Sequence, residues 1–227
     1  LFDMSNDSEL FRSAVQLAEG GFTRDGVDWV DHRGDRYVPL YEAKMGDFYD
    51  HRAAGYDNRG DDRGYRVLPE TSLERHKNPS YDPHPFSWVP GREVSERLRN
   101  AGWNRQWLLG FKNVTSPTNE RTFISNLLPR WGVGNSMPVM LPLGAKSPTA
   151  LVANISSIVF DYVARQKAGG VNLNFFYVKQ FPVFPPSFYS SEDVAFVSSR
   201  VLELTYTSYS MTPFATDLGY EGPPFAW

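Results

Sequence analysis

Charged residues around the first predicted strand have types and a spacing that could support metal-dependent chemistry. Glu42 and Lys44 form a Glu-x-Lys triplet at the end of that strand, and Asp31 and Asp35 precede it. In Mg²⁺ nucleases the carboxylates hold the metal ion, and a lysine steadies the attacking water. Asp35, Glu42 and Lys44 therefore form one candidate catalytic set. The alternative is an edge strand that carries charged side chains on its outer face.

A second candidate is the tetrapeptide Asn78-Pro79-Ser80-Tyr81. It is similar to the Asn-Pro-Pro-Tyr motif of adenine methyltransferases, in which the asparagine and a proline carbonyl bind the flipped base and the aromatic ring stacks on it. Here the third residue is serine, and no glycine-rich strand-turn-helix that could bind S-adenosylmethionine precedes the motif. We therefore interpret these residues as a proline-rich turn.

A third candidate lies where an apolar, helical pattern reaches Gly169-Gly170. Lys167, Asn172, Asn174 and Lys179 surround this break. Asparagine side chains hydrogen-bond to phosphates or to adenine edges, and lysines neutralise the DNA backbone. The alternative is that the glycines only end a helix and that the polar residues form its solvated rim.

Composition limits the possible functions. The 227 residues include 23 basic and 26 acidic side chains, which gives a net charge of −3, whereas nucleic-acid binders are usually basic. DNA binding would therefore have to rest on a local cluster of cations. The absence of cysteine excludes disulfides and thiolate metal sites and fits a cytoplasmic location. No apolar run reaches about 18 residues, so we expect no membrane partner.

Hydrophobic periodicity predicts a mixed α/β chain of the α+β class. Helices are expected at 8–19, 91–103, 149–167 and 190–204. Strands are expected at 36–45, 106–114, 121–128, 137–143 and 174–184. In the first of these strands Pro39 indicates an edge or a bulge.

The helix predicted at 149–167 should be a core element. Ser147 would cap it and Pro148 would take the first helical position. Its apolar stripe consists of Leu151, Ile155, Ile158, Val159 and Tyr162.

Three segments, 39–56, 107–140 and 159–186, resemble in this order the C-terminal target-recognition region of large bacterial adenine-N6 DNA methyltransferases. Such enzymes serve restriction-modification and phage-defence systems, often with restriction and methylation in one polypeptide. The resemblance covers most of residues 36–227. The segment from Gly169 to Leu173 with the proline-containing run after it is also similar to the recognition domains of type I specificity subunits.

This resemblance implies a twisted, largely antiparallel sheet with flanking helices, formed by residues 31–227 as a DNA target-recognition domain. Residues 1–30 would connect it to an upstream catalytic domain that this chain lacks. The fragment would have no catalytic residues, metal or cofactor of its own. S-adenosylmethionine would bind the methyltransferase domain of the same polypeptide, and double-stranded DNA would be the shared partner.

Within this reading the polar candidates receive separate roles. The charged loop at 57–66 would supply base-reading side chains. Asn119, Asn172 and Asn174 would bind bases or the backbone. Phosphates would be bound by six basic residues: Lys44, Arg52, Lys112, Arg121, Lys167 and Lys179.

Two functions of other classes stay open. One is the Mg²⁺ nuclease built on Asp35, Glu42 and Lys44. The other is a protein-interaction module of a phage-defence complex, which the aromatic content of 15% and the weak basicity favour.

Overall fold

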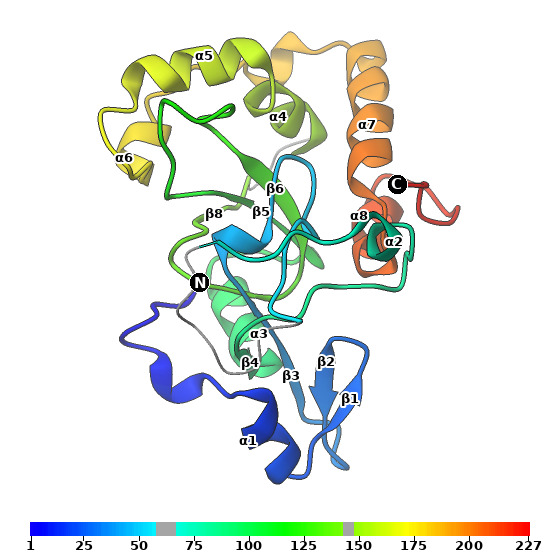
Figure 1. Ribbon diagram of the computed structural model, residues 1–227. Coiled ribbons are helices and arrows are strands. Elements are labelled where there is room, and N and C mark those ends of the chain that lie inside the picture. Colours follow the sequence, from blue (N-terminus) through cyan, green and yellow to red (C-terminus); the bar gives the residue numbers. More distant parts are fainter. Residues whose placement is uncertain (58–66, 143–147) are drawn as a thin grey trace.

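The computed structural model of the protein describes residues 1–57, 67–142 and 148–227. It has a mixed α+β fold with two mostly antiparallel sheets, as predicted. Figure 1 shows one sheet with α1 at one end of the molecule, the second sheet in the middle, and helices α4 to α7 at the other end. Residues 58–66 of the predicted base-reading loop and the predicted cap Ser147 lie outside the described residues.

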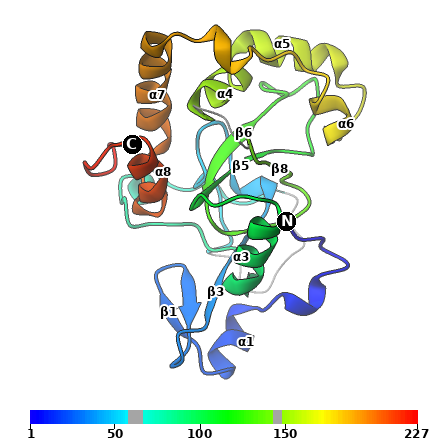
Figure 2. The same ribbon diagram turned by 180° about the vertical axis from the view of Figure 1, so that it is seen from behind.

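The first sheet has the strand order β1-β2-β3-β4, and β7 pairs with β3 in parallel. The β1–β2 hairpin turns at Gly26, whose φ of 62° is a left-handed conformation that glycine adopts without strain. Helix α3 packs against β3 and β4, as Figure 2 shows from behind. The strands are β1 (Thr23–Asp25), β2 (Asp28–Val30), β3 (Arg36–Tyr41), β4 (Trp88–Pro90) and β7 (Gly132–Val133).

The prediction that Pro39 marks an edge strand is wrong, because β3 lies between β2 and β4. Strand β3 pairs with β2 only as far as Tyr37. Pro39 lies beyond this pairing, so its missing backbone N–H removes no hydrogen bond between β2 and β3. Beyond it, Leu40 pairs with Gly132 of β7. A Cβ at Gly132 would overlap a methyl group of Val89, so glycine is what lets the two backbones approach.

The second sheet has the strand order β6-β5-β8 and is antiparallel throughout. Its strands fall within the three segments predicted between residues 106 and 143, apart from the end of β6. All five residues of β5 and of β6 are buried. The sequence of β5 is a continuous apolar run, as expected for a buried strand, whereas β6 begins with the buried polar residues Ser125 and Asn126. The bounds are β5 (Trp107–Phe111), β6 (Ser125–Pro129) and β8 (Val139–Met140).

Helices cover both sheets around one large hydrophobic core. The helices predicted at 91–103 and 190–204 are confirmed: α3 buries Val94 and Leu98, and α7 begins at a capping box between Ser190 and Asp193. The α-helices are α1 (Ala14–Glu19), α2 (Leu73–His76), α3 (Gly91–Asn100), α4 (Pro148–Ile155), α5 (Ile158–Lys167), α6 (Phe175–Val178), α7 (Ser191–Thr205) and α8 (Thr212–Asp217). Short 3₁₀ turns are η1 (Ser8–Leu10), η2 (Ala43–Met45), η3 (Pro186–Phe188) and η4 (Tyr209–Met211).

The single helix predicted at 149–167 is instead two helices, α4 and α5. The Ser157 side chain accepts a hydrogen bond from the backbone N–H of Phe160 at 3.1 Å, so the chain restarts a helix there. The restart changes which face points inward. Ile155 is 3% exposed, as predicted, whereas Ile158 is 74% exposed, contrary to the prediction.

The end of α5 also differs from the predicted glycine cap. The N–H of Ala168 bonds to the carbonyl of Ala164 at 2.9 Å, and neither Gly169 nor Gly170 has a positive φ. The helix still ends at Lys167, the predicted position.

The buried strand predicted at 174–184 is wrong. Asn174 accepts a hydrogen bond from the N–H of Phe176 at 3.0 Å and begins the short helix α6. Prolines at 182, 185 and 186 then remove backbone donors that a strand ladder would need. Phe176 and Phe184 are exposed, while Phe181 is buried.

The boundary predicted at residue 30 falls inside the first sheet, because β1 and β2 continue directly into the pairing with β3. Phe2 is also buried, and its N–H bonds to the carbonyl of Val133 at 3.0 Å. Across the part of the chain that the structure describes, we find no helix with the length and apolar character needed to cross a membrane.

Candidate nucleic-acid interface

Two loops that are distant in sequence pair with each other beside α5. They are the β5–β6 connection, residues 112–123, and the loop that leaves α5, residues 168–180. Asn172 forms an antiparallel bridge with Val114. The N–H of Thr115 bonds to the Val171 carbonyl at 2.9 Å, and the N–H of Leu173 bonds to the Asn113 carbonyl at 2.7 Å. This pairing fixes the backbone on which Asn172 sits.

Two charged side chains of α5 hold the 112–123 connection in place. Asp161 is buried, and one of its carboxylate oxygens accepts the backbone N–H groups of Thr122 and Phe123, each at 2.8 Å. Its other oxygen accepts from Arg165 at 3.1 Å. Arg165 also donates to the backbone carbonyls of Pro117 (2.7 Å) and Glu120 (2.9 Å). The connection therefore has a defined shape without any ligand.

Five of the nine predicted DNA-contacting residues are exposed on these two loops and the end of α5: Asn119, Lys167, Asn172, Asn174 and Lys179. The ammonium group of Lys167 lies 3.5 Å from the backbone carbonyl of Gln180, which brings the two ends of the 168–180 loop together. The loop thus carries two lysines at its base and two asparagines between them. The Asn174 carbonyl oxygen is already used to cap α6.

Arg121 and Lys112 lie on the same β5–β6 connection but face the 47–50 turn. The Arg121 guanidinium stands 4.7 Å from the ring centre of Phe48. Burial lowers the pKa of Lys112, an effect that nearby Asp47 partly offsets. In the turn itself, Tyr49 has a φ of 61°, and no other non-glycine residue within the described ranges has a positive φ. Lys112 and Arg121 are therefore half-buried, whereas Lys167 and Lys179 are exposed.

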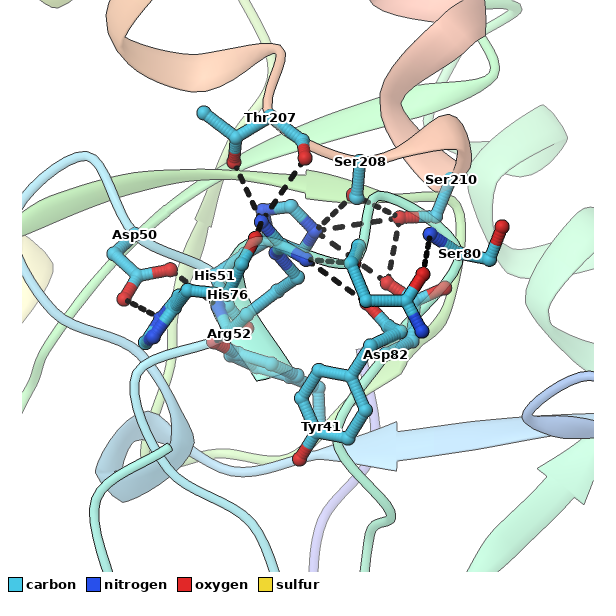
Figure 3. Close-up of polar contacts among 12 residues, drawn as sticks. Tyr41, Asp50, His51, Arg52, His76, Ser80, Asp82, Thr207, Ser208 and Ser210 are labelled. Carbon is cyan, nitrogen blue, oxygen red and sulfur yellow. Dashed lines mark hydrogen bonds and ion pairs between the residues drawn. The ribbon is translucent and has the colours of Figure 1, made fainter. Parts of the chain in front are cut away.

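The assignment of Arg52 to a phosphate is corrected by the structure. Arg52 is 0% exposed, and its guanidinium is enclosed by backbone carbonyls from two separate segments, 76–81 and the region of Thr207 (Figure 3). It donates to the carbonyls of His76 (3.0 Å), Asn78 (3.0 Å), Tyr81 (3.2 Å) and Thr207 (3.0 Å). Because these bonds use the guanidinium inside the protein, Arg52 cannot reach DNA. The Asn78–Tyr81 turn is thus structural, as the turn interpretation expects.

Of the predicted nuclease residues, the structure brings together Glu42 and Lys44 but not Asp35. Lys44 pairs with Glu42 at 3.4 Å and lies 5.0 Å from the ring centre of Tyr56. Asp35 precedes β3 and Glu42 follows it, and an extended chain of this length separates them by roughly 20 Å. Among the residues that the structure describes, no group of three or more acidic or histidine side chains could hold a metal ion.

A buried polar cluster beside Arg52 escaped the sequence interpretation. Nε2 of His51 lies 3.1 Å from the Ser208 hydroxyl and 3.3 Å from that of Ser210, which donates to Asp82 at 2.8 Å. A nearby pair joins His76 Nε2 to Asp50 at 2.9 Å, and the Trp227 ring stacks on His76 with centroids 4.0 Å apart. No pattern in the sequence indicates these contacts, because the partners come from separate segments.

This cluster contains serine, histidine and aspartate but does not have the geometry of a nucleophilic triad. In a triad the carboxylate binds the imidazole nitrogen that faces away from the serine. Here Asp82 stands 3.7 Å from the same Nε2 that faces the serines. Nδ1 of His51 is buried and has no hydrogen-bond partner in the described part of the chain. The cluster therefore joins the 47–52, 76–82 and 207–210 segments into one structure.

Comparisons with protein-family models, curated proteins and solved structures found no match.

Proposed function

We propose that this chain is the DNA target-recognition domain of an adenine-N6 DNA methyltransferase of a restriction-modification or phage-defence system. It would hold duplex DNA and read bases in the major groove while a methyltransferase domain outside this chain flips and methylates an adenine. The observation that carries the proposal is the convergence of Asn119, Lys167, Asn172, Asn174 and Lys179 on two paired loops. The resemblance to target-recognition regions supports the same assignment.

The chemistry of the loops suits this role. Asparagine amides can donate to and accept from an adenine edge, and exposed lysines bind phosphates without regard to sequence. The Asp161–Arg165 pair fixes the 112–123 connection before DNA arrives, so less conformational entropy is lost on binding. Local placement of Lys167 and Lys179 also accounts for DNA binding by a chain whose net charge is −3.

In this proposal the chain has no methyl-transfer activity of its own. S-adenosylmethionine would bind the partner methyltransferase domain of the parent polypeptide, and the cytoplasmic location stays a prediction from composition. The nuclease alternative loses support because Asp35 lies at the opposite end of β3 from Glu42. The protein-interaction alternative stays open.

Salt-dependent binding to duplex DNA tests the proposal with matched variants. Lys167→Ala should weaken binding to all duplexes alike and reduce the salt slope by about one counterion. Lys77→Ala is the control, because Lys77 is also an exposed lysine but lies at the end of α2, outside the two paired loops. It should change neither affinity nor slope.

A second pair of variants separates base reading from phosphate binding. Asn172→Ala should cost about 1–3 kcal/mol on a preferred duplex and little on random DNA. Asn104→Ala, an exposed asparagine before β5, should behave as wild type. If Lys167→Ala and Asn172→Ala both bind as wild type does, the loops do not form the DNA interface.

A further inference from the structure

Residues of α5, α7 and the 182–189 segment line an apolar groove. Figure 1 shows α5 and α7 at the end of the molecule farthest from the first sheet. Two hollows of about 540 Å³ and 550 Å³ form it, and they share Val183, Phe184 and Tyr189. Helix α4 packs against both α5 and α7 at its base. Residues of the 182–189 segment line both hollows, so we treat the two hollows as one groove.

Among the residues that the structure describes, no charged side chain lines either hollow. Val159 and Val163 of α5 form one wall, and Val194 and Val197 of α7 contribute to the other side. A phosphate backbone would find no cation in such a groove. If two copies of the chain packed against each other at this groove, the contact would bring no like charges together.

The exposed apolar surface is at the upper end of what a soluble monomer leaves bare. Phe184, Phe188 and Tyr162 are 53%, 61% and 64% exposed, which amounts to roughly 350 Å². Ile158 and Val159, each 74% exposed, bring the total to roughly 600 Å². This is the top of the range of about 300–600 Å² for the largest patch on a typical monomer, and the walls of the hollows would have to supply the rest of the roughly 800 Å² per partner of a standard protein interface.

We propose that this groove is a dimerisation surface, in which a second copy of the chain packs across it about a two-fold axis. The surface supplies both shapes that such a contact needs. The hollows accept apolar side chains, and the outer face of α5, with Ile158 and Tyr162, projects beside them. An isologous contact places the projecting face of each copy against the hollow of the other. The inference does not rest on DNA recognition.

Analytical ultracentrifugation of the purified chain tests the proposal. Wild type should sediment as a dimer at roughly 10 µM and above, since interfaces of this size have dissociation constants from micromolar downward. Val159→Asp should raise the dissociation constant at least about 100-fold, because it places an unpaired charge in the contact. Since Val159 is 74% exposed, the variant should keep the wild-type circular dichroism and melting temperature.

Val15→Asp is the matched control. Val15 is 54% exposed on α1, at the opposite end of the molecule, so the same substitution should leave the dimer intact. A wild-type chain that stays monomeric at all concentrations would overturn the proposal and assign the groove to a different protein. A mass that keeps rising with concentration would overturn the closed, two-fold dimer, and equal dissociation of the two variants would move the contact elsewhere.

Discussion

The two polar regions of this protein differ in what their side chains bind. Around Arg52 the polar groups are buried and bind one another or the backbone of distant segments. At the end of α5 and on the 168–180 loop, Lys167, Asn172 and Lys179 are exposed. The backbone there pairs with the 112–123 connection, and the Lys167 ammonium lies 3.5 Å from the Gln180 carbonyl. Both regions contain residues whose amino-acid types alone suggest contact with DNA. Only burial and hydrogen bonding separate a structural cation from one that is free to bind a ligand.

The largest expected effect comes from the buried region. Arg52→Met would leave four backbone carbonyls without their donor, which should lower the free energy of unfolding by about 3–5 kcal/mol. Urea unfolding measures this change. Arg121→Met is the control, since its contact with Phe48 is worth about 0.5–1 kcal/mol. A loss of less than 1 kcal/mol for Arg52→Met would contradict the structural role.

The next effect compares two isoleucines that straddle the break between α4 and α5. Ile155→Ala should lower the free energy of unfolding by about 2–5 kcal/mol, because Ile155 is 3% exposed. Ile158→Ala should stay within about 0.5 kcal/mol of wild type, because Ile158 is 74% exposed. Thermal melts of both variants are sufficient. Equal losses would mean that 149–167 is one continuous core helix after all.

A smaller effect tests how the exposed region is held. Asp161→Asn keeps the size of the side chain but removes the charge that pairs with Arg165, so stability should fall by about 2 kcal/mol. Limited proteolysis should then cut within residues 112–123 first. Asp25→Asn, at an exposed ion pair with Arg36, should cost less than about 1 kcal/mol. Unchanged proteolysis would show that α5 does not fix the connection.

The smallest effect depends on pH. Burial, with a hydrogen bond to Asp57, raises the pKa of Tyr81 to about 12. Above about pH 10 the unfolded chain loses this proton first, so stability should fall as pH rises, by about 1 kcal/mol from Tyr81 between pH 9 and pH 11. Tyr81→Phe should remove that part of the loss in urea unfolding at the two pH values. An identical loss in the variant would exclude Tyr81 as its source.

Features of the fold that depend on residues close together in the sequence could be predicted, whereas contacts between residues far apart in the sequence could not. The helix predicted at 190–204 and the strand predicted at 106–114 rest on local pattern, and α7 and β5 confirm them. The 174–184 prediction failed because an apolar run suggested a strand, whereas the asparagine cap of α6 and Pro182 decided the backbone.

The role of Arg52 could not be predicted at all. Its four carbonyl partners lie 24, 26, 29 and 155 residues away, so only the folded chain brings them together. The pairing of the 112–123 and 168–180 loops has the same origin, because Val114 precedes α4 and α5 in the sequence and Asn172 follows them. The residue types could suggest that Asn119, Lys167, Asn172 and Lys179 share a function, but not that the connection that carries Asn119 pairs with the 168–180 loop.

Selection from a pool of randomised duplexes tests the central proposal most directly. The wild-type chain should enrich one short sequence containing adenine. Asn172→Ala should lose the preference at one position while keeping the others, because one base edge would lose its hydrogen bonds. The control variant Asn104→Ala should enrich the same DNA sequence as the wild-type chain. If wild type enriches no sequence at low salt, or if Asn172→Ala enriches the same sequence equally well, the assignment of base reading to the 168–180 loop is contradicted.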